Sequence, residues 1–122
     1  MSVTPTDLYA FGSRDGPRPP RVGFDVKPDS AGMLEPGKPP FPRGVSTFAD
    51  PAQAPLTRHY HKLPKGTPLP EGLDVLADGV DVNKASKHRA GHHTIYPVVR
   101  MHLDQFTELY LKLPWEYAGK KP

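Results

Sequence analysis

Three arginines close to the amino terminus are the first residues whose chemistry suggests a ligand. Arg14, Arg18 and Arg21 lie together within residues 14–21. A guanidinium stays protonated at physiological pH, and its planar fork can bind two phosphate oxygens at once. The spacing therefore suggests that at least one of the three contacts a phosphate group. A basic loop in water, or one that binds an acidic protein partner, is the competing interpretation.

Hydroxyl and imidazole groups on two β-prone segments could bind a sugar or an amide. Ser46 and Thr47 follow a glycine, which lets a ligand approach the backbone closely. His92 and Thr94 share a face if their segment is extended, because side chains alternate along a strand, so only one of His92 and His93 can face a cleft. Packing and hydrogen bonding to nearby backbone are the alternative roles of these side chains.

Metal chemistry is not expected. The chain contains no cysteine, which excludes disulfides, thiolate ligands and a cysteine nucleophile. His59 and His61 share a strand face, but zinc normally needs three or four convergent ligands, and the spacing matches no known motif. Glu71 falls in a turn and Glu108 on the polar side of a helix, so both carboxylates are expected to be solvated.

Composition limits the architecture and the class of protein. The 11 glycines follow no three-residue period, which excludes a collagen-like repeat, and the 17 prolines argue against a helical bundle. Charge is +3, from 16 Lys and Arg against 13 Asp and Glu, which favours a phosphate-bearing ligand but falls short of a nucleic-acid-binding arm. No apolar stretch is long enough to cross a membrane, and no cleaved signal peptide is expected. We expect one domain over residues 1–122.

Short strands must position these groups. Alternating or β-prone residues predict strands at 8–11, 22–26, 45–48, 59–63, 73–77 and 92–96. A long proline-rich loop is predicted at 27–43, a helical turn starting at Asp50, and a solvated loop at 78–90. Apolar residues at three- and four-residue steps predict one helix over 103–113, which Pro114 ends. The pattern predicts an α+β fold whose helix packs on a sheet.

Three segments in this order carry a resemblance to a known family. Residues 44–48, 63–73 and 92–97 are similar to its G-x-S-x-F, P-x-G-T-x-[IL]-P-x-x-L and H-x-T-I-x-P motifs, and an amphipathic helix follows. The family is that of type VI secretion effector toxins with an ADP-ribosyltransferase-like fold, of the effector-two type. The resemblance covers about residues 7–113.

The resemblance implies a compact split β-sheet, as in mono-ADP-ribosyltransferase toxins, with a cleft for NAD. It implies an antibacterial toxin that uses NAD as its substrate without a metal, acts on an unknown macromolecular target in the cytoplasm, and is held inactive by a cognate immunity protein. Export would need no cleaved signal peptide, and no membrane partner is expected. The implied catalytic residues are Ser46, Thr47 and His92, and the implied cofactor-binding residues are Tyr9, Arg14, Arg21, Ser46 and Thr94.

Two positions depart from the family pattern. Many members have an arginine after the tyrosine of the opening strand, where this chain has Ala10. Either Arg14, Arg18 or Arg21 supplies the basic group from the adjoining loop, or that function is lost. The predicted strand at 92–96 contains no acid, whereas such transferases normally present a glutamate on a late strand. Two other interpretations therefore stay open: a non-enzymatic binding toxin with a degenerate NAD cleft, and a small basic nucleotide- or RNA-binding module.

Overall fold

The computed structural model describes residues 2–39, 42–50, 58–78 and 91–121, which form mainly antiparallel strands and one late helix. This arrangement confirms the predicted α+β class. The elements are β1 (Leu8–Ser13), β2 (Gly16–Pro17), β3 (Met33–Leu34), β4 (Val45–Phe48), β5 (Arg58–Leu63), β6 (Leu73–Leu76), β7 (His92–Pro97), β8 (Met101–His102), α1 (Leu103–Leu111) and β9 (Glu116–Lys121). No helix among the described residues is long and apolar enough to cross a membrane.

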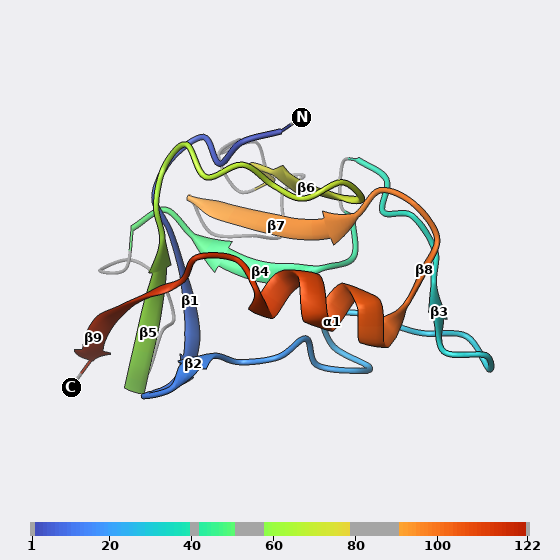
Figure 1. The fold of residues 1–122 in the computed structure, drawn as a ribbon, viewed down its shortest axis with the longest axis horizontal. Coiled ribbons are helices and arrows are strands. Elements are labelled where there is room, and N and C mark those ends of the chain that lie inside the picture. Colours follow the sequence, from blue (N-terminus) through green and yellow to red (C-terminus); the bar gives the residue numbers. More distant parts are fainter. Residues whose placement is uncertain (1, 40–41, 51–57, 79–90, 122) are drawn as a thin grey trace.

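The main sheet consists of two halves that meet at one point. Its strand order is β6-β7-β4-β1-β5-β9, and β2 pairs with β1. The strands β1 and β4 are paired only through Tyr9 and Phe48, although β1 has an extended register with β5 and β4 with β7. Figure 1 shows β1 and β5 running at a steep angle to β4 and β7. The sheet therefore opens between β1 and β4 on either side of a single residue pair.

The helix α1 runs alongside β4 and β7 (Figure 1), and its buried residues share one hydrophobic core with residues from both halves of the sheet. Its residues Phe106 and Tyr110 are fully buried against Leu8, Leu63 and Ile95, which come from three strands. Such burial of an apolar stripe supplies most of the stability of a short helix. His102 Nδ1 accepts a hydrogen bond from the Asp104 N–H at the start, and Pro114 follows the end, which confirms the predicted helix within two residues.

The predicted strand at 22–26 is wrong, because this segment forms a turn. Val22 and Phe24 are exposed, whereas Val26 is buried. Gly23 has a φ of 89°, a left-handed conformation that a glycine adopts without strain. The Asp25 carboxylate accepts a hydrogen bond from the Arg21 N–H at 2.8 Å, which closes the turn. The hydrogen bond from Arg21 N–H to the Asp25 side chain thus favours a turn over the strand that the alternating apolar residues predict.

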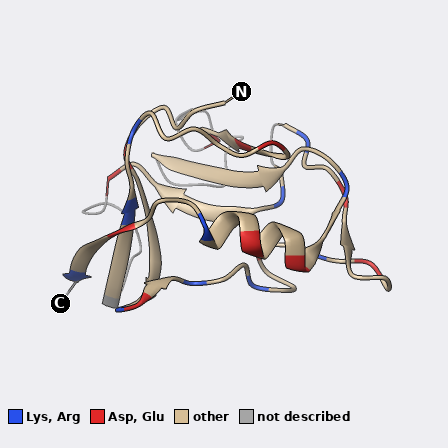
Figure 2. Cartoon of the chain, viewed as in Figure 1, with Lys and Arg blue, Asp and Glu red and all other residues tan. Residues whose placement is uncertain are grey.

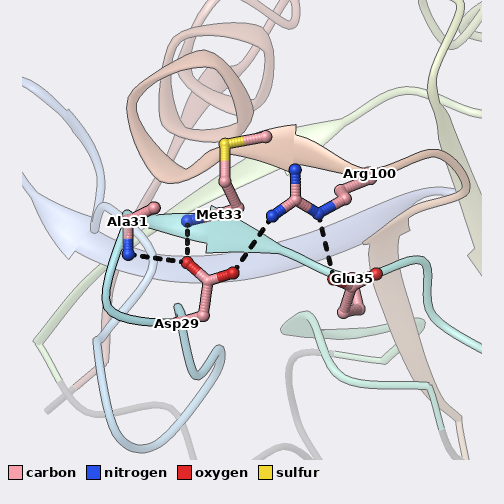
Figure 3. Close-up of polar contacts among 5 residues, drawn as sticks. All are labelled: Asp29, Ala31, Met33, Glu35 and Arg100. Carbon is pink, nitrogen blue, oxygen red and sulfur yellow. Dashed lines mark hydrogen bonds and ion pairs between the residues drawn. The ribbon is translucent and has the colours of Figure 1, made fainter.

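The proline-rich loop at 27–43 contains a two-residue strand, β3, which pairs with β8. The Asp29 carboxylate accepts hydrogen bonds from Ala31 N and Met33 N, both at 2.9 Å. Arg100 binds Asp29 at 3.1 Å and Glu35 at 3.0 Å from the other side (Figure 3). We call Asp29, Glu35 and Arg100 the exposed clamp. Each of these side chains is at least 43% exposed.

The remaining strand predictions are confirmed in position but not always in pairing. β5 and β6 form as predicted on the two sides of the turn at Gly66, yet they do not pair, because β7, β4 and β1 lie between them in the sheet order. Strands β2, β3, β8 and β9 were not predicted. The predicted helical turn after Asp50 and most of the predicted loop at 78–90 lie outside the described residues. Asp78 itself is described, and the expectation that it is solvated is wrong because its residue is 8% exposed.

Candidate functional site

Two adjoining hollows lie near the point where β1 and β4 diverge, the first between these strands and the second beside β4 and β7. The first, of about 190 Å³, is lined by Ala10, Phe11, Arg18, Arg21, Asp25, Val45, Ser46, Phe48 and Tyr110. The second, of about 290 Å³, is lined by Phe24, Asp25, Pro42, Arg43, Gly44, Ser46, His92 and Thr94. Asp25 and Ser46 belong to both, so we call the two hollows together the split cleft. Cavities of about 300 to 1,000 Å³ are typical of small-molecule sites.

Two of the three amino-terminal arginines line the split cleft. The Arg18 guanidinium lies 5.0 Å from the centre of the Phe11 ring, and that of Arg21 lies 5.2 Å from the Phe24 ring. Partial burial lowers the pKa of Arg18, the Arg21 charge lowers it further, and Asp25 opposes this shift. Arg14 lies instead at the turn between β1 and β2, in another hollow. Figure 2 shows basic residues along the chain that follows β2 beneath α1.

Ala10 lines the same hollow as Arg18 and Arg21. This is the position where many members of the resembling family have an arginine after the tyrosine. Arg18 and Arg21, from the segment after β2, therefore line the hollow beside Ala10, where this chain lacks the arginine of those family members.

Asp25 is an acid of the cleft that the sequence analysis missed. Its residue is 8% exposed and it lines both hollows. The carboxylate accepts a hydrogen bond from the Arg21 N–H and lies 3.5 Å from the Arg21 guanidinium. An Asp four residues after Arg21 and two after Gly23 is the sequence signal of such a turn, but the apolar alternation around it predicted a strand.

The structure separates the two neighbouring hydroxyls of β4. Ser46 is half-buried and lines both hollows. Thr47 is fully buried, lines neither hollow and donates a hydrogen bond to the His93 carbonyl at 2.9 Å. Gly44 is required by strand packing, because a Cβ there would lie 2.1 Å from the Ile95 carbonyl oxygen. Ser46 is therefore the hydroxyl of this pair that the fold brings to the cleft.

His92 and Thr94 lie on β7 beside Ser46 and share one buried acid. The His92 Nδ1–H donates to Asp78 Oδ1 at 2.6 Å, and the Thr94 hydroxyl donates to Asp78 Oδ2. The side chain of Asp78 is 0% exposed. We call these three residues the buried cluster. It holds the His92 ring, 5.4 Å from that of Phe48, beside the second hollow.

His93 and Tyr9 do not line the split cleft. The His93 Nδ1–H donates to the Gly91 carbonyl at 2.8 Å, and His93 is buried. Tyr9 packs edge-on against Tyr60, with ring centres 6.0 Å apart, in a small aromatic cluster around Phe48. Tyr9 therefore supports the cleft from the single junction between the two halves of the sheet.

His59 and His61, the two histidines considered as metal ligands, each have a hydrogen-bond partner in the structure. His59 Nδ1 is 2.8 Å from the Tyr117 hydroxyl, and the His61 ring Nε2–H donates to the Ser13 carbonyl at 2.7 Å. Among the described residues no group of three or more His, Asp or Glu side chains is arranged to hold a metal ion.

Comparison with known proteins identifies one family. A family model described as "Tse2 ADP-ribosyltransferase toxin" matches residues 5–117. The match spans both halves of the sheet, α1 and the segment after β2 that carries Arg18, Arg21 and Asp25. No curated protein matches the chain.

Proposed function

The chain belongs to the Tse2 ADP-ribosyltransferase toxin family, and from this premise we propose that it is a toxin that binds NAD in the split cleft and transfers ADP-ribose from it. The observation that carries the proposal is that two adjoining hollows, the first at the opening between β1 and β4, are lined by two arginines, a serine and a histidine. A sheet divided at this point also agrees with the split sheet of mono-ADP-ribosyltransferase toxins.

Transfer of ADP-ribose from NAD needs a site that stabilises the positive charge that develops on the ribose. The bond between nicotinamide and C1′ of the adjoining ribose breaks, and its electron pair leaves with nicotinamide. A nucleophile of the acceptor bonds to C1′ and loses its proton, so the products are ADP-ribosylated acceptor, nicotinamide and H⁺. Positive charge develops on the sugar, as in glycosidases, and a carboxylate close to it stabilises the transition state.

The residues of the split cleft fit these tasks. Arg18 and Arg21 would bind the two phosphates of NAD, where a bidentate cation is favoured. Ser46 would bind a ribose hydroxyl or the nicotinamide amide, and Asp25 would lie near the developing positive charge. His92 would bind a ribose hydroxyl in the orientation that Asp78 gives it. Aromatic rings, such as that of Phe11, line the same cleft and suit a flat ring of the substrate.

Residues that do not line the cleft would act through their neighbours. The Thr47 hydroxyl ties β4 to the His93 carbonyl of β7, and Tyr9 packs at the junction of the two halves. Arg14 would contact NAD only if the substrate extended beyond the split cleft. The proposal also includes action in the cytoplasm of the target cell, export by type VI secretion and a cognate immunity protein in the producer.

The direct test measures nicotinamide release from NAD by the purified protein. Removing one charged hydrogen bond to a phosphate lowers binding by about tenfold or more, so Arg21→Gln should raise KM by at least that factor. Arg14→Gln is the matched control, because it removes the same charge outside the split cleft. Ser46→Ala should lower kcat/KM by about tenfold, whereas Ser30→Ala, in an exposed turn, should leave it unchanged.

Expression in bacterial cytoplasm tests the same proposal in cells. Wild type should arrest growth and lower cellular NAD or give an ADP-ribosylated product, and Ser46→Ala should do so less. Normal growth with wild type would contradict the cytoplasmic toxin. Arrest with unchanged NAD and no ADP-ribosylated product would contradict the transferase and favour a binding toxin with a degenerate cleft.

A further inference from the structure

Tyr110 combines complete burial with an unused polar group. It lies on α1, is 0% exposed and forms part of the lining of the first hollow. Among the described residues, its hydroxyl oxygen is the one buried side-chain polar atom that has no hydrogen-bond partner. Native proteins leave few such groups unpaired, because a buried hydroxyl loses its bonds to water without replacement.

Packing alone does not explain this hydroxyl. The ring of Tyr110 lies 5.3 Å from that of Trp115, and the Trp115 indole N–H donates to the Tyr110 carbonyl. Both contacts use the ring or the backbone, so a phenylalanine would keep them. Phe106, one turn earlier on the same face of α1, is just as buried and has no hydroxyl.

The charges around Tyr110 belong to the cleft. Burial raises the pKa of Tyr110, the Asp25 charge raises it further, and the Arg18 charge lowers it. The hydroxyl therefore keeps its proton at neutral pH and is available as a hydrogen-bond donor. Arg18 and Asp25 line the same hollow as Tyr110, so the residue that carries the unpaired donor borders the groups that a ligand would contact.

We propose that the Tyr110 hydroxyl donates a hydrogen bond to an acceptor oxygen of the ligand in the split cleft. This inference rests on the proposed function, under which the ligand is NAD and the acceptor is a phosphate or ribose oxygen. The free protein carries the cost of an unpaired hydroxyl, and ligand binding removes it. Tyr110 is then a ligand-binding residue that α1 contributes, in addition to those of the strands and the segment after β2.

The test compares Tyr110→Phe with wild type in two measurements. Thermal unfolding without ligand should occur at the same or a higher temperature, because the variant removes an unpaired polar group and keeps the ring. Calorimetric titration with NAD should give a Kd about tenfold higher, the loss expected for one hydrogen bond to a ligand. The rise in Tm that NAD causes in wild type should shrink by the corresponding amount.

Tyr117→Phe is the matched control, because Tyr117 is half exposed, bonds His59 and lies outside the split cleft. Its Kd for NAD should equal that of wild type. A Tyr110→Phe variant that binds NAD as tightly as wild type would overturn the inference and leave the proposed function intact. A clear fall in its Tm without ligand would also overturn it, since the hydroxyl would then stabilise the free protein. Wild type that binds no NAD would instead overturn the proposed function and, with it, the ligand assigned to Tyr110.

Discussion

Two polar clusters in this protein have the same plan and different surroundings. In the exposed clamp, Arg100 binds Asp29 and Glu35 and is 51% exposed. In the buried cluster, Asp78 binds His92 and Thr94 and its side chain is 0% exposed. In each cluster, one side chain binds two partners: Arg100 in the clamp and Asp78 in the buried cluster. Figure 3 shows the clamp at the side of the proline-rich loop, whereas the buried cluster adjoins the split cleft.

The difference in burial decides what each cluster can do. Water and salt replace the partners of an exposed ion, so such pairs contribute little to stability. A buried carboxylate that loses its partners finds no water, so its hydrogen bonds are expensive to break and hold geometry firmly. The clamp therefore shapes a loop at small energetic gain. The buried cluster fixes the orientation of His92, a residue of the candidate site.

Removing the central acid of the buried cluster should have the largest effect. Asp78→Ala leaves His92 and Thr94 buried without their shared acceptor, and breaking a buried pair in this way costs about 3 to 5 kcal/mol. Urea denaturation should show this loss as a lower midpoint. Nicotinamide release by the folded fraction should also fall, because the His92 ring loses its partner.

Asp15→Ala is the control for this change, since Asp15 lies exposed in the turn after β1. Its denaturation midpoint should remain that of wild type. If Asp78→Ala lost no more stability than Asp15→Ala, the contrast between the two clusters would fail.

The sequence predicted the features that depend on local patterns. Strand β4 and helix α1 follow from β-prone residues and from a three- and four-residue repeat, which each segment carries within itself. The turn at 22–26 was missed because alternation and turn chemistry compete there, and Asp25 with Gly23 decides the outcome. The strand β9 (Glu116–Lys121) was missed because its few apolar residues give no pattern, and pairing with β5 makes it a strand.

The candidate site could be predicted only in part. Ser46 and His92 were found because they fall in motifs that resemble a family, and they do lie at one cleft. Asp78 was missed because its partner His92 is 14 positions away and no pattern links them. Tyr110 falls on the apolar stripe that predicts the helix, and only the structure shows that its hydroxyl has no partner among the described residues and that the residue lines the cleft.

A smaller effect is expected when one hydroxyl of the buried cluster is removed. Thr94→Val keeps the shape of the side chain but removes the hydrogen bond to the Asp78 carboxylate, a loss of about 2 kcal/mol for a bond to a charged group. Thr47→Val is the matched variant, because the buried Thr47 hydroxyl donates to the neutral His93 carbonyl and should cost about 1 kcal/mol. Urea denaturation of both variants measures the difference.

The variants Thr94→Val and Thr47→Val also distinguish an effect on stability from an effect on NAD binding. Thr94→Val should also raise KM for NAD, since Thr94 lines the second hollow and helps to hold Asp78, while Thr47→Val should leave KM unchanged. Equal losses of stability in the two variants would mean that the charge of Asp78 adds nothing to its hydrogen bonds.

The smallest effect is expected in the exposed clamp, and it should depend on pH. Hydrogen bonds from the backbone of Met33 lower the pKa of Asp29 below its ordinary value of 3.8, with smaller contributions from Ala31 and Arg100. A depressed pKa stabilises the fold while the carboxylate is ionised, so the contribution is present above about pH 4 and is lost as pH falls through the folded pKa. Arg100 stays charged throughout this window, because its pKa is raised.

Asp29→Asn isolates the charge, since the amide oxygen can still accept the backbone hydrogen bonds. The variant should be slightly less stable than wild type between pH 5 and 8, by less than Thr94→Val, and the difference should shrink in high salt and vanish in acid. Urea denaturation of both proteins from pH 7 down to about pH 2 measures it. Two results would contradict the comparison of the two clusters. One is a stability difference between Asp29→Asn and wild type that grows on acidification. The other is a difference at neutral pH as large as the loss in Thr94→Val, because the exposed clamp would then be no weaker than the buried cluster.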